Sequence, residues 1–279
     1  GTVLARPAMQ APDYRLTAAV LDAGVAEAAA RGAPVRMVLI TNPENPLGIV
    51  HTRAELEEVL EWCRARRVHL VSDEIYANCV FDDATEFVSI LDVAEDKYGA
   101  DDAFVRTHVH ALFGMSKDFG LSGYRAGFLV SRNEELHAAC GGIHVGHGVS
   151  GDTQLRIAEL LTDDAWLDDF LDVARGHLRA GYKVVADALD GAGIPYVRAT
   201  SGMFVWADFS AFLAAPTREA ELALFEEVSA RARFVMTPGS AMVAAKPGWF
   251  RICTGWHAAK DLKDALTRAV AVVTAKRSA

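Results

Sequence analysis

Short apolar runs alternate with segments of helical periodicity along the first half of the chain. Residues 17–31 carry apolar side chains at helical spacing, and residues 35–41 (VRMVLIT) have the pattern of a buried parallel strand. A helix is predicted over 53–66, and further strands over 68–72, 109–113 and 126–131. Because strands and helices alternate in this order, we expect a mainly parallel sheet with crossover helices.

Local signals mark the ends of these elements. The stretch NPENPLG cannot be helical, since Pro43 and Pro46 each fix their own φ and restrict the preceding residue. Thr52 and Glu55 have the spacing of a capping box, which predicts that the helix begins at residue 53.

Helices dominate from residue 133 onward. They are predicted over 134–144, 152–161 and 166–189, the last ended by Gly191 and Gly193 before a strand-like segment from Pro195. Strands over 203–207 and 249–254 then alternate with helices over 218–231 and 258–275. We therefore expect an α/β fold of two domains, residues 1–163 and a smaller α+β part, residues 164–279, that begins with the joining helix.

Composition and charge narrow the class of protein. The chain is 51% apolar, yet no apolar run approaches the roughly 18 residues that span a bilayer. With 28 Lys and Arg against 37 Asp and Glu, the net charge of −9 argues against a nucleic-acid partner. Four widely spaced cysteines and no visible signal peptide suggest reduced thiols and a cytoplasmic location.

Polar groups that could carry chemistry follow three of the predicted strands, where ligands bind in open α/β sheets. The stretches are TNPENPLG (41–48), SDEIYAN (72–78) and GMSKDFGLSGYRAG (114–127). Each residue taken singly has an ordinary interpretation: Asn45 as turn chemistry, Asp73 as a helix cap or loop acid, Tyr76 as a half-buried aromatic, Lys117 as a surface lysine, Arg125 as the partner of a nearby acid.

The three stretches in this order resemble the class I/II aminotransferase family, pyridoxal-phosphate-dependent transferases of fold type I. The likeness extends over essentially the whole chain to PGWFRICTGW (247–256), and within the family it is greatest to the 1-aminocyclopropane-1-carboxylate synthase branch. It implies that residues 1–163 are the remainder of the large cofactor-binding domain, and that residues 164–279 are the joining helix and the small C-terminal domain.

The resemblance also implies roles. Lys117 would form the Schiff base with pyridoxal 5'-phosphate and then move the α-proton of the substrate. Asp73 would keep the pyridine nitrogen protonated, which makes the ring an electron sink. Tyr76 and Asn45 would hydrogen-bond the phenolic oxygen of the cofactor, and Arg125 would clamp its phosphate with a bidentate fork.

Arg251 lies in the apolar context GWFRICTG. An arginine that alternates outward from a strand is the ordinary interpretation, but in the family this position binds the substrate α-carboxylate, and Asn45 also belongs to the substrate site. One position departs from the family: Gly114 replaces a serine or threonine that bonds the phosphate. Either one donor is missing, or Ser116 or a backbone N–H replaces it.

Two further features carry less chemistry. His144 and His147 could meet on one helical face, but no carboxylate or thiol completes a ligand set, so no metal is expected. Phe204, in SGMFVW, lies in a segment that borders the substrate side in members of the family, but by itself it is interpreted as a core residue.

The resemblance implies an N-terminal region with a phosphate turn, a ring-stacking aromatic and a substrate-gating segment. Here only the strand-like GTVLA, which starts on Gly1, precedes the first predicted helix. We therefore expect the sequence to be a fragment that binds pyridoxal phosphate weakly on its own.

Three functions remain open. The first two share every residue named above: transamination of an α-amino acid, and the alternative, a 1-aminocyclopropane-1-carboxylate synthase-like lyase acting on S-adenosylmethionine. Transamination is placed slightly ahead, because the synthase-like branch of the family also holds proteins with plain transaminase chemistry. A catalytically silent binding protein derived from such an enzyme is the third, and the intact site residues argue against it. A homodimer is expected by resemblance only.

Overall fold

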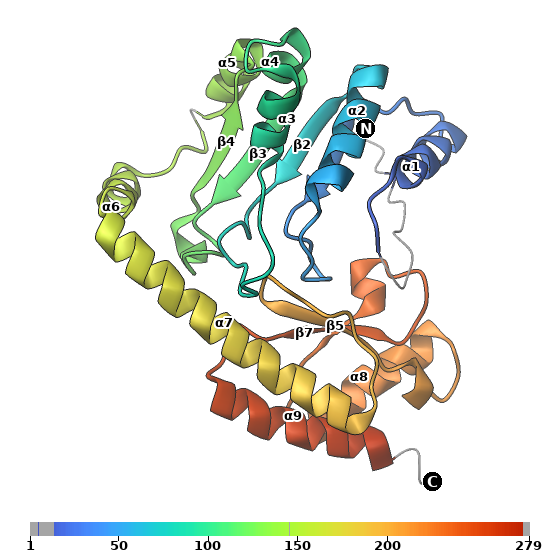
Figure 1. The fold of residues 1–279 in the computed structure, drawn as a ribbon. Coiled ribbons are helices and arrows are strands. Elements are labelled where there is room, and N and C mark those ends of the chain that lie inside the picture. Colours follow the sequence, from blue (N-terminus) through green and yellow to red (C-terminus); the bar gives the residue numbers. More distant parts are fainter. Residues whose placement is uncertain (1–4, 6–13, 145, 276–279) are drawn as a thin grey trace. The chain divides into compact units, whose positions relative to one another are not determined.

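The chain divides into two compact units, which we call the first and second units. A computed structural model describes residue 5, residues 14–144 and residues 146–275 (Figure 1); the predicted strand-like piece at residues 1–4 lies outside them. The first unit comprises Gly1–Pro43, Val50–Ala77 and Glu86–Asp169, and the second comprises Glu44–Ile49, Asn78–Thr85 and Phe170–Ala279. The expected α/β class is confirmed, with a mainly parallel sheet in the first unit and a small antiparallel sheet in the second.

The first unit is built on a four-stranded sheet of order β1-β2-β3-β4. All four strands were predicted: β1 (Met37–Thr41), β2 (His69–Asp73), β3 (Val109–Gly114) and β4 (Gly127–Ser131). The first three run parallel, as crossover helices require, whereas β4 runs antiparallel to β3.

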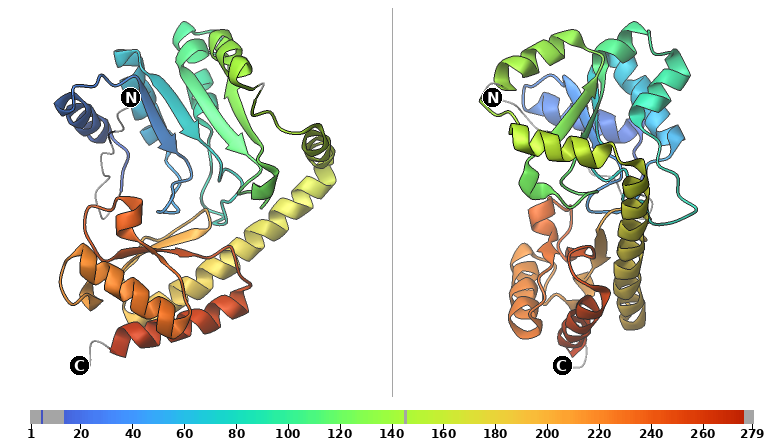
Figure 2. Two further views of the ribbon diagram at one scale, coloured as in Figure 1. Left: turned by 180° about the vertical axis from the view of Figure 1, so that it is seen from behind. Right: turned by 90° about the vertical axis from the view of Figure 1, so that its left-hand side faces the viewer.

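The described residues of the first unit form six α-helices. They are α1 (Ala18–Ala30), α2 (Arg53–Arg66), α3 (Ile90–Tyr98), α4 (Ala103–His108), α5 (Glu134–His144) and α6 (Gly151–Leu161). The predicted capping box of α2 is present, with Thr52 and Glu55 each accepting the other's backbone N–H. Helices α2, α3 and α4 lie on one side of the sheet and α5 lies on the other (Figure 2). Alternate strand residues such as Ile40 and Leu70 are buried in one core with side chains of α2 and α3.

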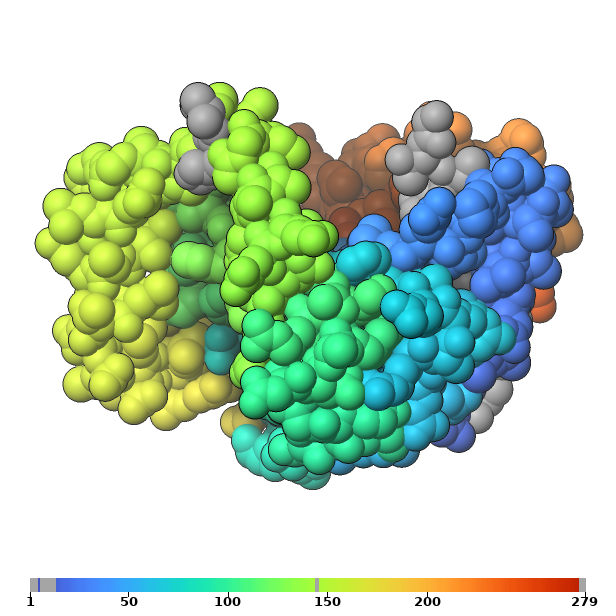
Figure 3. Space-filling view, turned by 90° about the horizontal axis from the view of Figure 1, so that it is seen from above, coloured from blue at the N-terminus to red at the C-terminus, as the bar shows by residue number. Residues whose placement is uncertain are grey.

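The other face of the sheet is left open at β1. Met37 and Leu39 point away from the buried core and are 53% and 55% exposed. Figure 3 shows α5, in light green, and α1, in blue, apart from each other on the surface of this unit. The first unit therefore has one packed face and, at β1, an apolar surface that the described residues do not cover.

The second unit packs three helices against a three-stranded antiparallel sheet of order β5-β7-β6. Its elements are α7 (Asp164–Ala192), which begins in the first unit, β5 (Phe204–Asp208), α8 (Arg218–Ala232), β6 (Thr237–Pro238), β7 (Trp249–Cys253) and α9 (Ala259–Thr274). Helix α7 is longer than predicted: Gly191 lies inside it, and Gly193, at φ +63°, follows its end.

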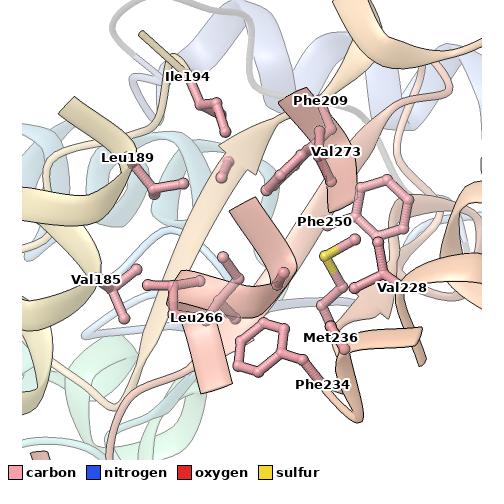
Figure 4. Packing of buried hydrophobic residues seen from close by; sticks show 14 of the residues in the cluster. Val185, Leu189, Ile194, Phe209, Val228, Phe234, Met236, Phe250, Leu266 and Val273 are labelled. Carbon is pink, nitrogen blue, oxygen red and sulfur yellow. The ribbon is translucent and has the colours of Figure 1, made fainter. Parts of the chain in front are cut away.

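The core of the second unit lies between these helices and one face of its sheet. Phe250 and Ile252 of β7 are fully buried there in one cluster with side chains of α7, α8 and α9. Figure 4 shows Phe250 in this cluster with Val228 of α8 and Val273 of α9. The opposite face carries the alternate residues of the same strands, including Phe204 and Arg251. No helix among the described residues is long and apolar enough to cross a membrane.

Candidate active site

Asp73 and Lys117 come together because they follow neighbouring strands. Asp73 is the last residue of β2, opposite Leu112 in the parallel β2–β3 pair, and Lys117 follows the end of β3. Burial raises the pKa of the Asp73 carboxyl above its usual value, while the Ile75 N–H and the positive charge of Lys117 oppose the rise. Lys117 makes no salt bridge with any described residue. The half-buried carboxylate of Asp73 thus interacts with the charge of Lys117, whose amine forms no salt bridge with a described residue.

The turn after Asp73 buries Tyr76 and is anchored by Glu74. Tyr76 is only 4% exposed, in a turn in which the Ala77 N–H donates to the Glu74 carbonyl at 3.0 Å. The Glu74 carboxylate accepts the Ile90 N–H at 2.9 Å, at the first residue of α3. Burial raises the pKa of Glu74, although that hydrogen bond favours the charged form. The sequence did not single out Glu74, which ties the end of β2 to α3.

The loop that carries Lys117 is closely packed where Gly114 departs from the family. A Cβ at Gly114 would lie 2.9 Å from the Ile75 side chain and 3.2 Å from the Ala126 carbonyl oxygen, so a larger residue would have to displace its neighbours. The Met115 N–H donates to that carbonyl at 3.2 Å. Ser116, the suggested substitute donor, makes no side-chain hydrogen bond with a described residue, so its hydroxyl is available to a ligand.

Arg125 is held in an unusual backbone conformation. It follows a short 3-10 helix, Ser122–Tyr124, at φ +53°, a left-handed conformation that costs a non-glycine residue about 1 kcal/mol. Its guanidinium is exposed and donates to the Ser122 carbonyl at 3.1 Å. No carboxylate of the described residues pairs with it, which leaves its charge for an anionic ligand.

Arg251 is the centre of a polar cluster in the second unit. Its Nη1 donates to Asn45 Oδ1 at 3.0 Å and its Nη2 to Thr237 Oγ1 at 3.4 Å. Its Cζ lies 4.1 Å from the centre of the Phe204 ring. The loop of Asn45 is fastened to this unit, since the Gly48 carbonyl accepts the Thr200 N–H at 2.8 Å. Two residues assigned to the substrate site, Asn45 and Arg251, are therefore hydrogen-bonded.

Two members of this cluster differ from the sequence interpretation. Phe204 is not a core residue: its neighbour Val205 points into the core, whereas Phe204 is half-buried on the face of Arg251. Thr237 was not singled out at all. Its strand has two residues, too short for a periodic pattern, and only its register opposite Arg251 reveals the contact.

The histidine pair considered as a metal site receives no test from the structure. The side chain of His144 is not described. Within the described part of the chain, no group of three or more His, Cys, Asp or Glu side chains is arranged to hold a metal ion.

Comparison with known proteins places the chain in a family. The sequence profile of aminotransferases of class I and II matches residues 2–268. The chain is 38% identical to 1-aminocyclopropane-1-carboxylate synthase 4 of Oryza sativa subsp. japonica, with 91% of this chain and 54% of the relative covered. It is 33% identical to 1-aminocyclopropane-1-carboxylate synthase 7 of Arabidopsis thaliana, with 91% and 56% covered. The chain thus spans about half the length of these relatives.

Solved structures share the fold. An aromatic aminotransferase from Pyrococcus horikoshii OT3 superposes with a TM-score of 0.80 at 22% identity, covering 95% of this chain and 65% of that one. The profile match extends over almost the whole chain. The chain therefore belongs to the class I and II aminotransferase family.

Proposed function

We propose that the chain acts in a pyridoxal-phosphate-dependent lyase of the 1-aminocyclopropane-1-carboxylate synthase type, with S-adenosylmethionine as substrate. The observation that carries this proposal is the identity of 38% and 33% to two such synthases over 91% of the chain. Sequence reasoning had placed transamination slightly ahead. The sequence relatives favour the lyase that it placed second.

The residues of the first unit fit pyridoxal 5'-phosphate, the cofactor of this family. A carboxylate and an amine interact electrostatically at the ends of β2 and β3, as the ring nitrogen and the aldehyde of the cofactor require. Arg125 has no acidic partner among the described residues, and Ser116 offers a hydroxyl, so both suit a phosphate. When bound, the cofactor supplies an electron sink for the substrate Cα.

The chain's own residues would bind the cofactor and substrate and move the proton. Lys117 Nζ would hold the cofactor at its carbonyl carbon and, as a free amine, would take the proton from the substrate Cα. Asp73 must be ionised to hold a proton on the ring nitrogen, and the charge of Lys117 favours that ionisation. Tyr76 would orient the cofactor through its phenolic oxygen. In the second unit, Arg251, hydrogen-bonded to Asn45, would bind the α-carboxylate of the substrate.

Transamination is the second candidate. The solved structure of an aromatic aminotransferase superposes on the chain, and the same residues would hold the cofactor and take the Cα proton. A homodimer, as is typical of the family, is part of either proposal and can be checked by sedimentation.

The decisive experiment compares the chain with its Lys117→Ala variant, both supplied with excess pyridoxal phosphate. We expect a lysine-dependent visible absorbance band, and release of 1-aminocyclopropane-1-carboxylate from S-adenosylmethionine that falls at least about a hundredfold in the variant. Lys263→Ala, at an exposed position of α9, is the matched control and should behave as wild type.

The alternatives give different results. Formation of 2-oxo acids from a panel of amino acids, without the cyclic product, would replace the lyase by a transaminase. A protein with neither product and no lysine-dependent band would be a binding protein.

A further inference from the structure

Arg251 of β7 needs its guanidinium held in one orientation if it is to receive a carboxylate. The Phe204 ring, 4.1 Å from Cζ, supports the guanidinium from one side. A ring face does not prevent the guanidinium from turning within its own plane. That rotation has to be fixed by hydrogen bonds to separate nitrogens.

Two acceptors do this, from two different parts of the second unit. Asn45 Oδ1 accepts from Nη1 at 3.0 Å, and Thr237 Oγ1 accepts from Nη2 at 3.4 Å. Two of the five guanidinium hydrogens are thus engaged, which leaves three for a ligand. No carboxylate of the described residues pairs with Arg251, so its charge is not neutralised within that part of the chain.

The two acceptors differ in how firmly the backbone holds them relative to Arg251. Asn45 lies in a loop, and its side chain is also proposed to hydrogen-bond the bound cofactor and substrate. Thr237 lies directly opposite Arg251 in the β6–β7 pair, where cross-strand neighbours have their Cβ atoms about 5 Å apart. The sheet therefore fixes Thr237 relative to Arg251 independently of any ligand.

We propose that Thr237 is a positioning residue, which holds the Arg251 guanidinium in the orientation that receives the α-carboxylate of the substrate. This inference rests on the proposed function only in taking an α-amino acid as the ligand, and it holds for lyase and transaminase alike. Thr237 itself need not touch the substrate.

The test uses two ligands that differ only in the α-carboxylate: L-methionine and 3-(methylthio)propylamine. Their dissociation constants are measured by calorimetry on the cofactor-loaded chain, in Thr237→Val, which keeps the shape and loses the hydroxyl, and in Thr237→Ser, which keeps the hydroxyl. Thr237→Val should bind L-methionine about 3- to 10-fold more weakly and the amine unchanged. Thr237→Ser should stay within about twofold of wild type.

A second readout needs no bound cofactor. Phenylglyoxal reacts with guanidinium groups, and peptide mass spectrometry reports the rate at Arg251 itself. We expect faster modification in Thr237→Val than in wild type or Thr237→Ser, because one hydrogen bond no longer restrains the side chain.

The outcomes separate the inference from the proposed function. Equal losses for both ligands in Thr237→Val, or no loss for either, would overturn the positioning role while wild type still prefers L-methionine. A wild-type chain that binds both ligands equally would mean that Arg251 holds no carboxylate, and the proposed function and the inference would then fail together.

Discussion

Histidines gather in the first unit at the ends of β2 and β3 that lie opposite the proposed cofactor residues. His69 Nδ1 lies 3.0 Å from His110 Nε2, and His110 Nδ1 lies 2.7 Å from Ser131 Oγ. The His108 ring is stacked on His69 with centroids 4.6 Å apart. Burial, with repulsion from His69, His108 and His137, lowers the pKa of His110 to about 4. At neutral pH this histidine is therefore an uncharged link between two strands.

The sign of the resulting pH dependence follows from the lowered pKa. In the unfolded chain His110 becomes protonated below its usual pKa of 6.5, whereas in the folded chain it stays neutral until about pH 4. The unfolded state thus binds more protons in this window, and the free energy of unfolding falls as pH falls from 6.5 to 4. The full shift corresponds to about 3 kcal/mol of stability that is present above pH 6.5.

Urea unfolding at several pH values between 7 and 4 should show this loss in wild type, and His110→Gln should lose about 3 kcal/mol less over the same range. His257→Gln, at an exposed position of the second unit, is the control and should keep the wild-type slope. A His110→Gln slope equal to that of wild type would contradict the assignment.

At the residue scale, the sequence placed Asp73 and Lys117 at the ends of predicted strands and Arg251 within one, and the structure confirms those positions. Thr237 and His110 could not be found in this way, because their contacts depend on the register of strands that are distant along the chain.

Helix α7 shows how a glycine can be required at one position of an element and dispensable at another. A Cβ at Gly181 would lie 2.3 Å from the Thr254 carbonyl oxygen, a backbone atom that cannot move aside cheaply. A Cβ at Gly176 would meet nothing within 4 Å. Helix propensity favours alanine equally at both positions. The packing around each glycine therefore decides whether alanine stabilises or destabilises the protein.

We expect Gly181→Ala to destabilise the protein by about 1–3 kcal/mol through overpacking. Gly176→Ala should stabilise it by about 0.5–1 kcal/mol, because glycine loses more backbone freedom on folding. Chemical unfolding of the two variants checks both signs, and destabilisation by both would show that helix α7 is not packed as described.

Elements with their own local signals were predicted, and those that depend on tertiary contacts were not. Helix α2 has its capping box and was found with its bounds. Helix α4 has six residues, too few for a periodic pattern, and is fastened by Asp102, which caps it and forms a bidentate pair with Arg64 at 2.7 and 2.9 Å. The antiparallel direction of β4 likewise has no signature within its own residues.

At the scale of the whole molecule, the length of the chain bears on one feature: the open face of the sheet in the first unit. On this face β1 presents Met37 and Leu39, which are 53% and 55% exposed. The chain spans 54% of a curated relative. Unfolding measurements can test whether a longer form of the protein covers this face.

Adjacent residues of β1 supply the matched pair. Ile40 is 6% exposed on the packed face and Leu39 is 55% exposed on the open face. In the 279-residue chain, Ile40→Ala should cost about 2–5 kcal/mol through the cavity it leaves, and Leu39→Ala only about 0.5 kcal/mol. If a longer form of the protein covers the face, Leu39→Ala should become as costly as Ile40→Ala in that form, while the cost of Ile40→Ala should not change. Urea unfolding of both variants in both forms measures the difference, and a large cost of Leu39→Ala in the 279-residue chain itself would show that the face is already covered there.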